Sequence, residues 1–134
     1  MLKKIVFTGG SGRFANIFKN IKKKKKIFFP NKKTLNIENY KSITKYLDRI
    51  KPKYLIHAAA LSRPMIIHER NITKSINLNI IGTANIVKAC KKRNIKLIYF
   101  STNQVYPCKK GNYLETDPLL PINNYAISKL GGEC

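Results

Sequence analysis

The chain has 134 residues, 43% of them hydrophobic, and a formal net charge of +21. This length and hydrophobic content are typical of one globular domain, and no stretch reaches the roughly 18 consecutive apolar residues of a membrane-spanning helix. We therefore expect a single domain with no membrane partner. The short basic start lacks the apolar core of a secretory signal, so a cytoplasmic location is expected.

The positive charge would suit nucleic acid, but the composition offers a simpler explanation. Lysine, isoleucine and asparagine, which AT-rich codons specify, make up 55 of the 134 residues, so compositional drift alone could produce the charge. The densest lysine run, residues 22–26, has no interleaved aromatic residues for base stacking. We therefore expect no specific nucleic-acid partner, and a basic nucleic-acid binder is the least favoured alternative.

The first half of the chain predicts strands that alternate with helices. Residues 4–8 form a short β-branched and aromatic run, typical of a buried strand, that ends in a glycine-rich turn. Apolar residues recur three or four positions apart over residues 13–22, which predicts a helix. A second strand is expected at residues 27–29, a short third strand at 34–37 and a helix at 39–50.

The second half continues the alternation. We expect a strand and its exit at residues 54–60, a long helix at 75–93, a strand at 96–101 and a final helix at 123–132. No hairpin-type turn separates the strands. The sequence therefore predicts an α/β domain with a doubly wound parallel sheet, which carries helices on both faces.

A glycine-rich turn joins the first predicted strand to the first predicted helix. Gly9 would permit a tight turn, Gly12 would let the backbone approach a pyrophosphate, and Ala15 is small enough for close packing of helix on strand. The free N–H groups at the start of the helix would face the phosphates. This context favours a dinucleotide-binding turn over an ordinary loop.

A tyrosine and a lysine lie four positions apart near the end of the chain. Tyr125 and Lys129 would share one face of the last predicted helix. The positive charge of Lys129 would favour the ionised form of the Tyr125 phenol, which could then exchange a proton near neutral pH. Thr102, at the end of a predicted strand, could hold a substrate oxygen at the same place.

No metal site is predicted. The three cysteines are odd in number and match no CxxC or zinc spacing, so they are interpreted as incidental. His57 and His68 lack a second set of ligands at a suitable spacing and are interpreted as packing or surface residues.

Taken together, these motifs resemble the extended short-chain dehydrogenase/reductase family, and within it the dTDP-4-dehydrorhamnose reductase-like and sugar-nucleotide epimerase/dehydratase members. TGGSGRFA at residues 8–15 resembles the family's TGxxGxxG, and NIIGT at residues 79–83 is similar to its NxxGT. STNQVY at residues 101–106 resembles STDxVY, and residues 113–133 are similar to the ExDPxxPxNxYxxSKLxGE stretch. The resemblance covers nearly the whole chain.

The resemblance implies a Rossmann-type NAD(P)-binding domain over residues 1–134 and an oxidoreductase that acts on a nucleotide-linked sugar. It implies four catalytic residues: Thr102, Tyr125, Lys129 and, as a structural and proton-relay residue, Asn79. The implied cofactor-binding residues are Gly9, Ser11, Gly12, Arg13, Phe14, Ala15, Ala58, Ala59, Ala60 and again Lys129.

Residues 30–33 bear on the choice of cofactor. This segment after the second predicted strand has no acidic residue to bind an adenosine ribose, whereas its two lysines, Lys32 and Lys33, would suit a 2′-phosphate. We therefore expect NADP slightly more than NAD.

Chains of the family run much longer than this one, so we expect the C-terminal substrate-binding region to be absent. If the chain is the complete product, weak stability and little or no turnover are expected; if it is a fragment, an ordinary full-length enzyme is expected. Reduction of a 4-keto-6-deoxy sugar is the favoured activity. The alternatives are a sugar-nucleotide epimerase or dehydratase, and a non-catalytic dinucleotide-binding remnant. The expected partner is a nucleotide-sugar substrate, and a homodimer is one expected assembly because relatives often pair through helices of this region.

Overall fold

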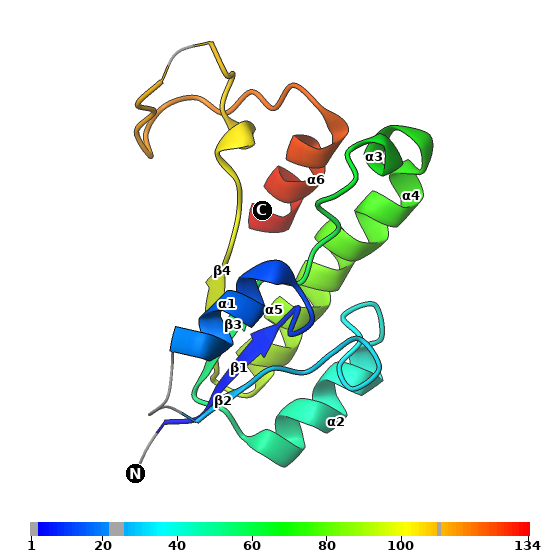
Figure 1. Ribbon diagram of the computed structural model, residues 1–134, viewed down its shortest axis with the longest axis vertical. Coiled ribbons are helices and arrows are strands. Elements are labelled where there is room, and N and C mark those ends of the chain that lie inside the picture. Colours follow the sequence, from blue (N-terminus) through cyan, green and yellow to red (C-terminus); the bar gives the residue numbers. More distant parts are fainter. Residues whose placement is uncertain (1–2, 22–25, 110) are drawn as a thin grey trace.

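A computed structural model describes residues 3–21, 26–109 and 111–134 and contains one parallel sheet (Figure 1). Its strands are β1 (Ile5–Thr8), β2 (Ile27–Phe28), β3 (Tyr54–His57) and β4 (Lys96–Tyr99), in the order β2-β1-β3-β4. In the register of β1 against β3, Ile5 lies opposite Tyr54 and Thr8 opposite His57. The carboxyl ends of β1 and β3 therefore meet at one edge of the sheet.

The helices connect these strands and extend beyond them. They are α1 (Arg13–Ile21), α2 (Tyr40–Ile50), α3 (Ile66–Arg70), α4 (Ile72–Ser75), the π-helix η1 (Ile76–Ile81), α5 (Gly82–Lys92), the 3₁₀-helix η2 (Asn103–Val105) and α6 (Asn124–Glu133). Figure 1 shows α3, α4 and α6 beyond the carboxyl ends of the strands, whereas α2 lies toward the opposite end.

Both faces of the sheet carry helices, as the sequence predicts. Val6 and Leu55 belong to the buried core together with residues of α2 and α5, whereas the Phe7 ring contacts the rings of Phe14 and Phe18 on α1. Because adjacent residues of a strand point to opposite faces, α1 and the α2–α5 pair cover different faces. The predicted doubly wound parallel α/β class is confirmed.

One compact cluster forms the core on the α2–α5 face. It contains Val6, Leu35, Ile37, Ile43, Tyr46, Leu47, Leu55, Ile86, Ala89, Cys90 and Ile95, each less than a tenth exposed. The α1 face is covered less completely, since Phe14 is 50% and Ile17 61% exposed. The apolar spacing that predicts α1 therefore identifies a helix whose apolar face is only partly buried.

Two predicted elements differ from the structure. Residues 34–37, predicted as a strand, form an irregular segment with turns at either end. The Asn31 side chain accepts hydrogen bonds from both the backbone N–H and the hydroxyl of Thr34, which favours a turn there. The predicted continuous helix over residues 75–93 is interrupted by the π-helix η1. The predicted helix over residues 13–22 is described as far as Ile21, and the lysine run at residues 22–26 lies, except for Lys26, outside the described residues.

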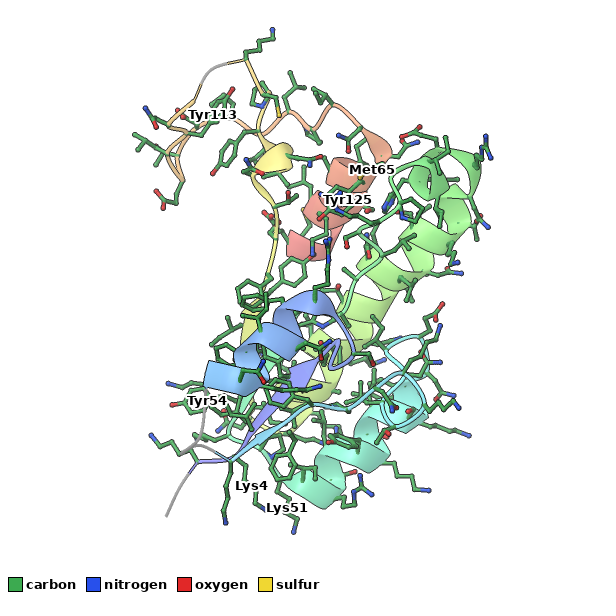
Figure 2. The ribbon with its side chains drawn as sticks, in the orientation of Figure 1. Lys4, Lys51, Tyr54, Met65, Tyr113 and Tyr125 are labelled. Carbon is green, nitrogen blue, oxygen red and sulfur yellow. The ribbon has the colours of Figure 1, made fainter. Side chains whose placement is uncertain are left out.

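The far end of the molecule carries the segment with Tyr125. Tyr113 and Tyr125 lie at the opposite end from Lys4 and Lys51 (Figure 2). Within the described ranges, no helix is both long and apolar enough to cross a membrane. Asn123 begins α6 by accepting the Ala126 backbone N–H at 2.8 Å, so the helix that carries Tyr125 and Lys129 has a defined start.

Candidate functional site

The glycine-rich turn between β1 and α1 is held against neighbouring backbone. Gly9 has φ of 74°, a conformation that side chains other than glycine rarely adopt, and its carbonyl accepts the Gly12 N–H at 2.8 Å. A Cβ atom at Gly10 would lie 2.5 Å from the carbonyl carbon of Phe29. The turn therefore lies directly against the exit of β2.

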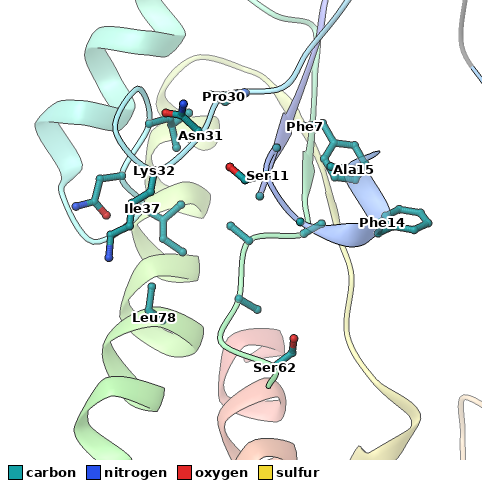
Figure 3. Close-up of a pocket in the computed structure, with 18 of the residues that line it drawn as sticks. Phe7, Ser11, Phe14, Ala15, Pro30, Asn31, Lys32, Ile37, Ser62 and Leu78 are labelled. Carbon is teal, nitrogen blue, oxygen red and sulfur yellow. The ribbon is translucent and has the colours of Figure 1, made fainter. Parts of the chain in front are cut away.

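A cavity of about 550 Å³ opens beside this turn at the carboxyl edge of the sheet (Figure 3). It brings together every predicted cofactor-binding position except Lys129, namely Gly9, Ser11, Gly12, Arg13, Phe14, Ala15, Ala58, Ala59 and Ala60. These residues come from two segments far apart in the sequence. The cavity lies where parallel α/β sheets commonly bind ligands.

The wall opposite the turn consists of residues outside the predicted set. The exit of β2 and the following loop provide Pro30, Asn31, Lys32 and Asn36, and Leu78 of η1 adds an apolar contact. Figure 3 shows Asn31, Lys32 and Ile37 across the cavity from Phe14 and Ala15. The position of this loop depends on tertiary packing. In the sequence, only its lysines indicated a role in cofactor binding.

The two lysines of this loop have different surroundings. The Lys32 ammonium lies 2.8 Å from a Glu38 carboxylate oxygen while the residue lines the cavity. Lys33 lines a separate surface hollow with Lys41, Lys45 and Arg49. Lys32 is therefore the lysine of this pair that lines the cavity, and part of its charge is balanced by Glu38.

A buried chain of hydrogen bonds runs beneath the cavity from β1 to α5. The Thr8 Oγ1 atom accepts the N–H groups of Ala58 and Ala59 at 3.2 and 3.1 Å and lies 2.8 Å from His57 Nδ1. The Thr83 hydroxyl donates to the Asn79 carbonyl at 2.7 Å and lies 3.1 Å from His57 Nε2. Burial lowers the pKa of His57 to about 3, so its ring is neutral at neutral pH.

These contacts define the tautomer of His57. Because the Thr83 hydroxyl gives its hydrogen to Asn79, its oxygen must accept from Nε2–H of His57. Nδ1 of the same ring is then the acceptor for the Thr8 hydroxyl. His57 is thus a packing residue, as predicted, and it holds the strand ends under the cavity.

Asn79 connects the cavity wall with α6. Its side-chain amide accepts the Leu61 N–H at 2.7 Å and donates to the Leu61 carbonyl at 2.9 Å. The same amide nitrogen donates to the Ser128 hydroxyl at 2.9 Å. Asn79 lies within the π-helix η1, a type of helix that often occurs at functional sites.

None of the predicted catalytic residues lines the cavity described above: Asn79 lies in η1, Thr102 follows β4, and Tyr125 and Lys129 belong to α6. Thr102 begins η2, and its Oγ1 accepts the Gln104 N–H at 3.3 Å, which leaves its own O–H hydrogen for another acceptor. Tyr125 is in the first turn of α6, and its ring lies 5.1 Å from that of His68. Thr102 and Tyr125 belong to neighbouring elements, since Gln104 Oε1 accepts from Asn123 at 3.0 Å.

Lys129 is buried, with 3% of its surface exposed. Its ammonium donates to the Phe100 carbonyl at 2.6 Å and lies 4.1 Å from the centre of the Tyr99 ring. Burial lowers the pKa of Lys129 to about 8, an effect that the Glu133 carboxylate opposes. The structure thus places the Lys129 ammonium at the end of β4, one helical turn after Tyr125.

No group of three or more His, Cys, Asp or Glu side chains that could hold a metal occurs within residues 3–21, 26–109 and 111–134. The fold and the cavity together define a Rossmann-type nucleotide-binding domain. The sequence matches the RmlD substrate binding domain family over residues 3–134. The chain belongs to this family.

Individual relatives support the assignment. The chain is 32% identical over 136 residues to the GDP-L-colitose synthase of Yersinia pseudotuberculosis, an alignment of 95% of this chain and 44% of that protein. It is 32% identical over 98 residues to the methionine adenosyltransferase 2 subunit beta of Danio rerio, over 73% of this chain and 29% of that protein.

A solved structure confirms the fold. The dTDP-4-dehydrorhamnose reductase of Bacillus anthracis, crystallised in complex with NADP, superposes with a TM-score of 0.93 at 28% sequence identity. The superposition covers 99% of this chain and 48% of that one. The chain therefore spans less than half the length of each of these three relatives.

Proposed function

We propose that residues 1–134 are the cofactor-binding part of an NADP-dependent reductase that acts on a nucleotide-linked sugar. The observation that carries the proposal is the cavity in which the glycine turn, the start of α1 and Ala58, Ala59 and Ala60 converge. Its volume of about 550 Å³ lies within the usual range of small-molecule sites. The backbone N–H groups at the start of α1 suit a pyrophosphate.

The opposite wall favours NADP over NAD. None of the described residues that line the cavity is acidic, whereas NAD sites usually place a carboxylate on the adenosine ribose. Asn31 and Lys32 are available there to contact a 2′-phosphate. The relative from Bacillus anthracis was crystallised with NADP, in agreement with this choice.

We assign the chemistry to Thr102, which follows β4, and to Tyr125 and Lys129 of α6. A bound NADPH would supply a hydride for the sugar carbonyl. In this proposal Tyr125 gives a proton to the carbonyl oxygen, the Thr102 hydroxyl holds that oxygen, and Lys129 contacts the nicotinamide ribose. Asn79 would position α6 through its bond to Ser128. The name of the relative from Bacillus supports a nucleotide-linked 4-keto-6-deoxy sugar as substrate, and that of the relative from Yersinia supports a nucleotide-linked sugar. An epimerase or dehydratase is the alternative activity.

A second candidate function is dinucleotide binding without turnover. The match to a methionine adenosyltransferase subunit indicates that sequences similar to this one also occur in proteins named for a different reaction. In this alternative the glycine turn and the cavity keep their role, and Tyr125 has none in chemistry.

Titration of the 134-residue chain with NADPH and NADH, followed by cofactor fluorescence, tests the proposal. We expect saturable binding that is tighter for NADPH and is retained in Tyr125→Phe, because Tyr125 does not line the cavity. Turnover of a 4-keto sugar nucleotide that Tyr125→Phe abolishes would support the reductase, whereas binding without turnover would favour the second candidate. A folded chain that binds neither cofactor would overturn both.

A further inference from the structure

His68 is a fully buried imidazole next to the proposed proton donor. It lies in α3 with 0% of its surface exposed, and its Nδ1 atom is 2.7 Å from the hydroxyl of Ser75, which is equally buried. Its Nε2 atom has no hydrogen-bond partner among the described residues. A buried polar atom without a partner costs free energy, so the burial of this ring calls for an explanation.

The ring of His68 packs against the side chain of Tyr125. The two rings lie 5.1 Å apart at an interplanar angle of 61°, an edge-to-face arrangement that aromatic pairs prefer. The contact of the Ser75 hydroxyl with Nδ1 fixes the rotation of the imidazole that packs against the phenol ring. The Ser75–His68 bond also joins α4 to α3 across Asn71, which ends α3 and begins α4.

His68 and its neighbour Glu69 also hold the first turn of α6. The Asn124 amide nitrogen donates to a Glu69 carboxylate oxygen at 2.7 Å and to the His68 carbonyl at 3.4 Å. Residues of α3 therefore contact two consecutive positions of α6, Asn124 and Tyr125. Farther along α6, the Ser128 hydroxyl accepts a hydrogen bond from the Asn79 amide, and the Lys129 ammonium donates one to the Phe100 carbonyl.

We propose that His68, oriented by Ser75, is a positioning residue that fixes the ring of Tyr125 for proton transfer. The catalytic meaning of this contact rests on the role proposed above for Tyr125, whereas the contact itself can be tested without turnover. Burial lowers the pKa of His68 against the opposing effect of the Glu69 carboxylate, which keeps the ring uncharged at neutral pH. An uncharged ring suits an edge-to-face contact that holds the phenol without adding a charge beside it.

The first test is the NMR spectrum of the tyrosine rings, with the Tyr125 signals assigned by their loss in Tyr125→Phe. We expect His68→Ala and Ser75→Ala to shift the Tyr125 ring signals more than those of any other tyrosine. Cys90→Ala is the matched control, because it opens the buried core at α5 and leaves the His68–Tyr125 contact in place. It should reduce stability without moving the Tyr125 signals.

The proposal is overturned if a folded His68→Ala or Ser75→Ala chain keeps the Tyr125 signals unchanged, or if Cys90→Ala shifts them as much. Should His68→Ala fail to fold, the Tyr125 signals of Ser75→Ala and His68→Phe decide the proposal. His68→Phe keeps a ring at this position but loses the bond to Ser75. We expect His68→Phe to move the Tyr125 signals less than His68→Ala does.

Turnover provides the second readout. Where the chain reduces a 4-keto sugar nucleotide, Ser75→Ala should lower kcat about tenfold, because a misplacement of about 1 Å can cost about a hundredfold in rate and the loss of one orienting contact is expected to move the phenol by less. The Kd for NADPH should stay unchanged, since neither Ser75 nor His68 lines the cofactor cavity. Unchanged kcat in that variant would contradict a positioning role. A chain that binds no NADPH would instead overturn the proposed function, and the NMR result would still decide the His68 contact.

Discussion

Gly10 and Gly12 belong to the same turn but have different neighbours. A Cβ atom at Gly10 would meet the Phe29 carbonyl at 2.5 Å, a distance that backbone atoms cannot accommodate without moving. A Cβ atom at Gly12 would have the Gly9 carbonyl oxygen as its one near neighbour, at 3.1 Å, and Gly12 is otherwise exposed to the cavity. Gly10 therefore serves the packing of β1 against β2, and Gly12 leaves room for a ligand.

This difference predicts separable effects of two alanine substitutions. Gly10→Ala should lower the free energy of unfolding by about 1–3 kcal/mol, as overpacking of a dense region does. Gly12→Ala should leave stability nearly unchanged but weaken NADPH binding about tenfold, a loss of about 1.4 kcal/mol. Urea unfolding and fluorescence titration of both variants measure the two quantities. Equal effects of both substitutions on unfolding and on binding would contradict the assignment.

Buried polar side chains join the elements beneath the cavity. Thr8 at the end of β1, His57 at the end of β3 and Thr83 in α5 form one hydrogen-bonded series. Such a series is favourable only when each member is satisfied, so its stability depends on the neutral state of His57. The connection between strands beneath the cofactor turn is therefore sensitive to pH.

The pKa of about 3 for His57 sets the direction of this sensitivity. In the unfolded chain the imidazole takes up a proton below its ordinary value of 6.5, whereas in the folded chain it stays neutral until about pH 3. The free energy of unfolding should therefore fall as the pH drops from 6.5 toward 3, with a contribution from His57 of up to about 1.4 kcal/mol per pH unit. In His57→Gln, which cannot titrate, this contribution should be missing.

Urea unfolding at neutral and mildly acidic pH compares the two chains. His68 is also buried with a lowered pKa, so the wild-type curve contains its contribution, and the difference between wild type and His57→Gln isolates that of His57. Parallel pH curves for the two chains would show that His57 does not control this part of the fold.

The same elements show what the sequence could predict. The four strands and the helices at α1 and α2 follow from apolar patterns, which are local properties, and α6 agrees with the helix expected over residues 123–132. The π-helix η1 could not be predicted, because it changes backbone hydrogen bonds but leaves a continuous helical pattern of apolar residues. Leu35 and Ile37 are buried as a strand pattern suggests, yet hydrogen bonds to Asn31 favour a turn at the start of this segment.

The candidate site likewise has one part that the sequence predicts and another that it does not. The turn and Ala58, Ala59 and Ala60 have recognisable motifs, and the structure brings them to one cavity. The opposite wall and the Ser75–His68–Tyr125 contact depend on how α3, α4 and α6 pack. Ser75 and His68 are seven residues apart, with the end of one helix and the start of the next between them, so no spacing rule predicts their contact.

At the scale of the whole molecule, the β4 edge of the sheet carries exposed apolar side chains near the site. β4 is the last strand in the order β2-β1-β3-β4, and its outer edge pairs with no described strand. Ile98 is 48% and Phe100 43% exposed, and the Phe100 ring packs at 5.2 Å against Phe14 of α1, which is itself half exposed. An open strand edge beside exposed apolar side chains is a surface that favours association.

We therefore expect the 134-residue chain to self-associate with increasing concentration, and the double variant Ile98→Lys/Phe100→Lys to be more monomeric. Charged side chains at an edge strand oppose pairing with another chain, and both positions are exposed enough to accept lysine without burying its charge. Sedimentation velocity from micromolar to millimolar concentration measures the effect. Leu114→Lys is the matched control, because Leu114 is 62% exposed in a loop that lies outside the sheet. A wild-type chain that stays monomeric throughout, or an equal effect of Leu114→Lys, would show that the β4 edge does not drive association.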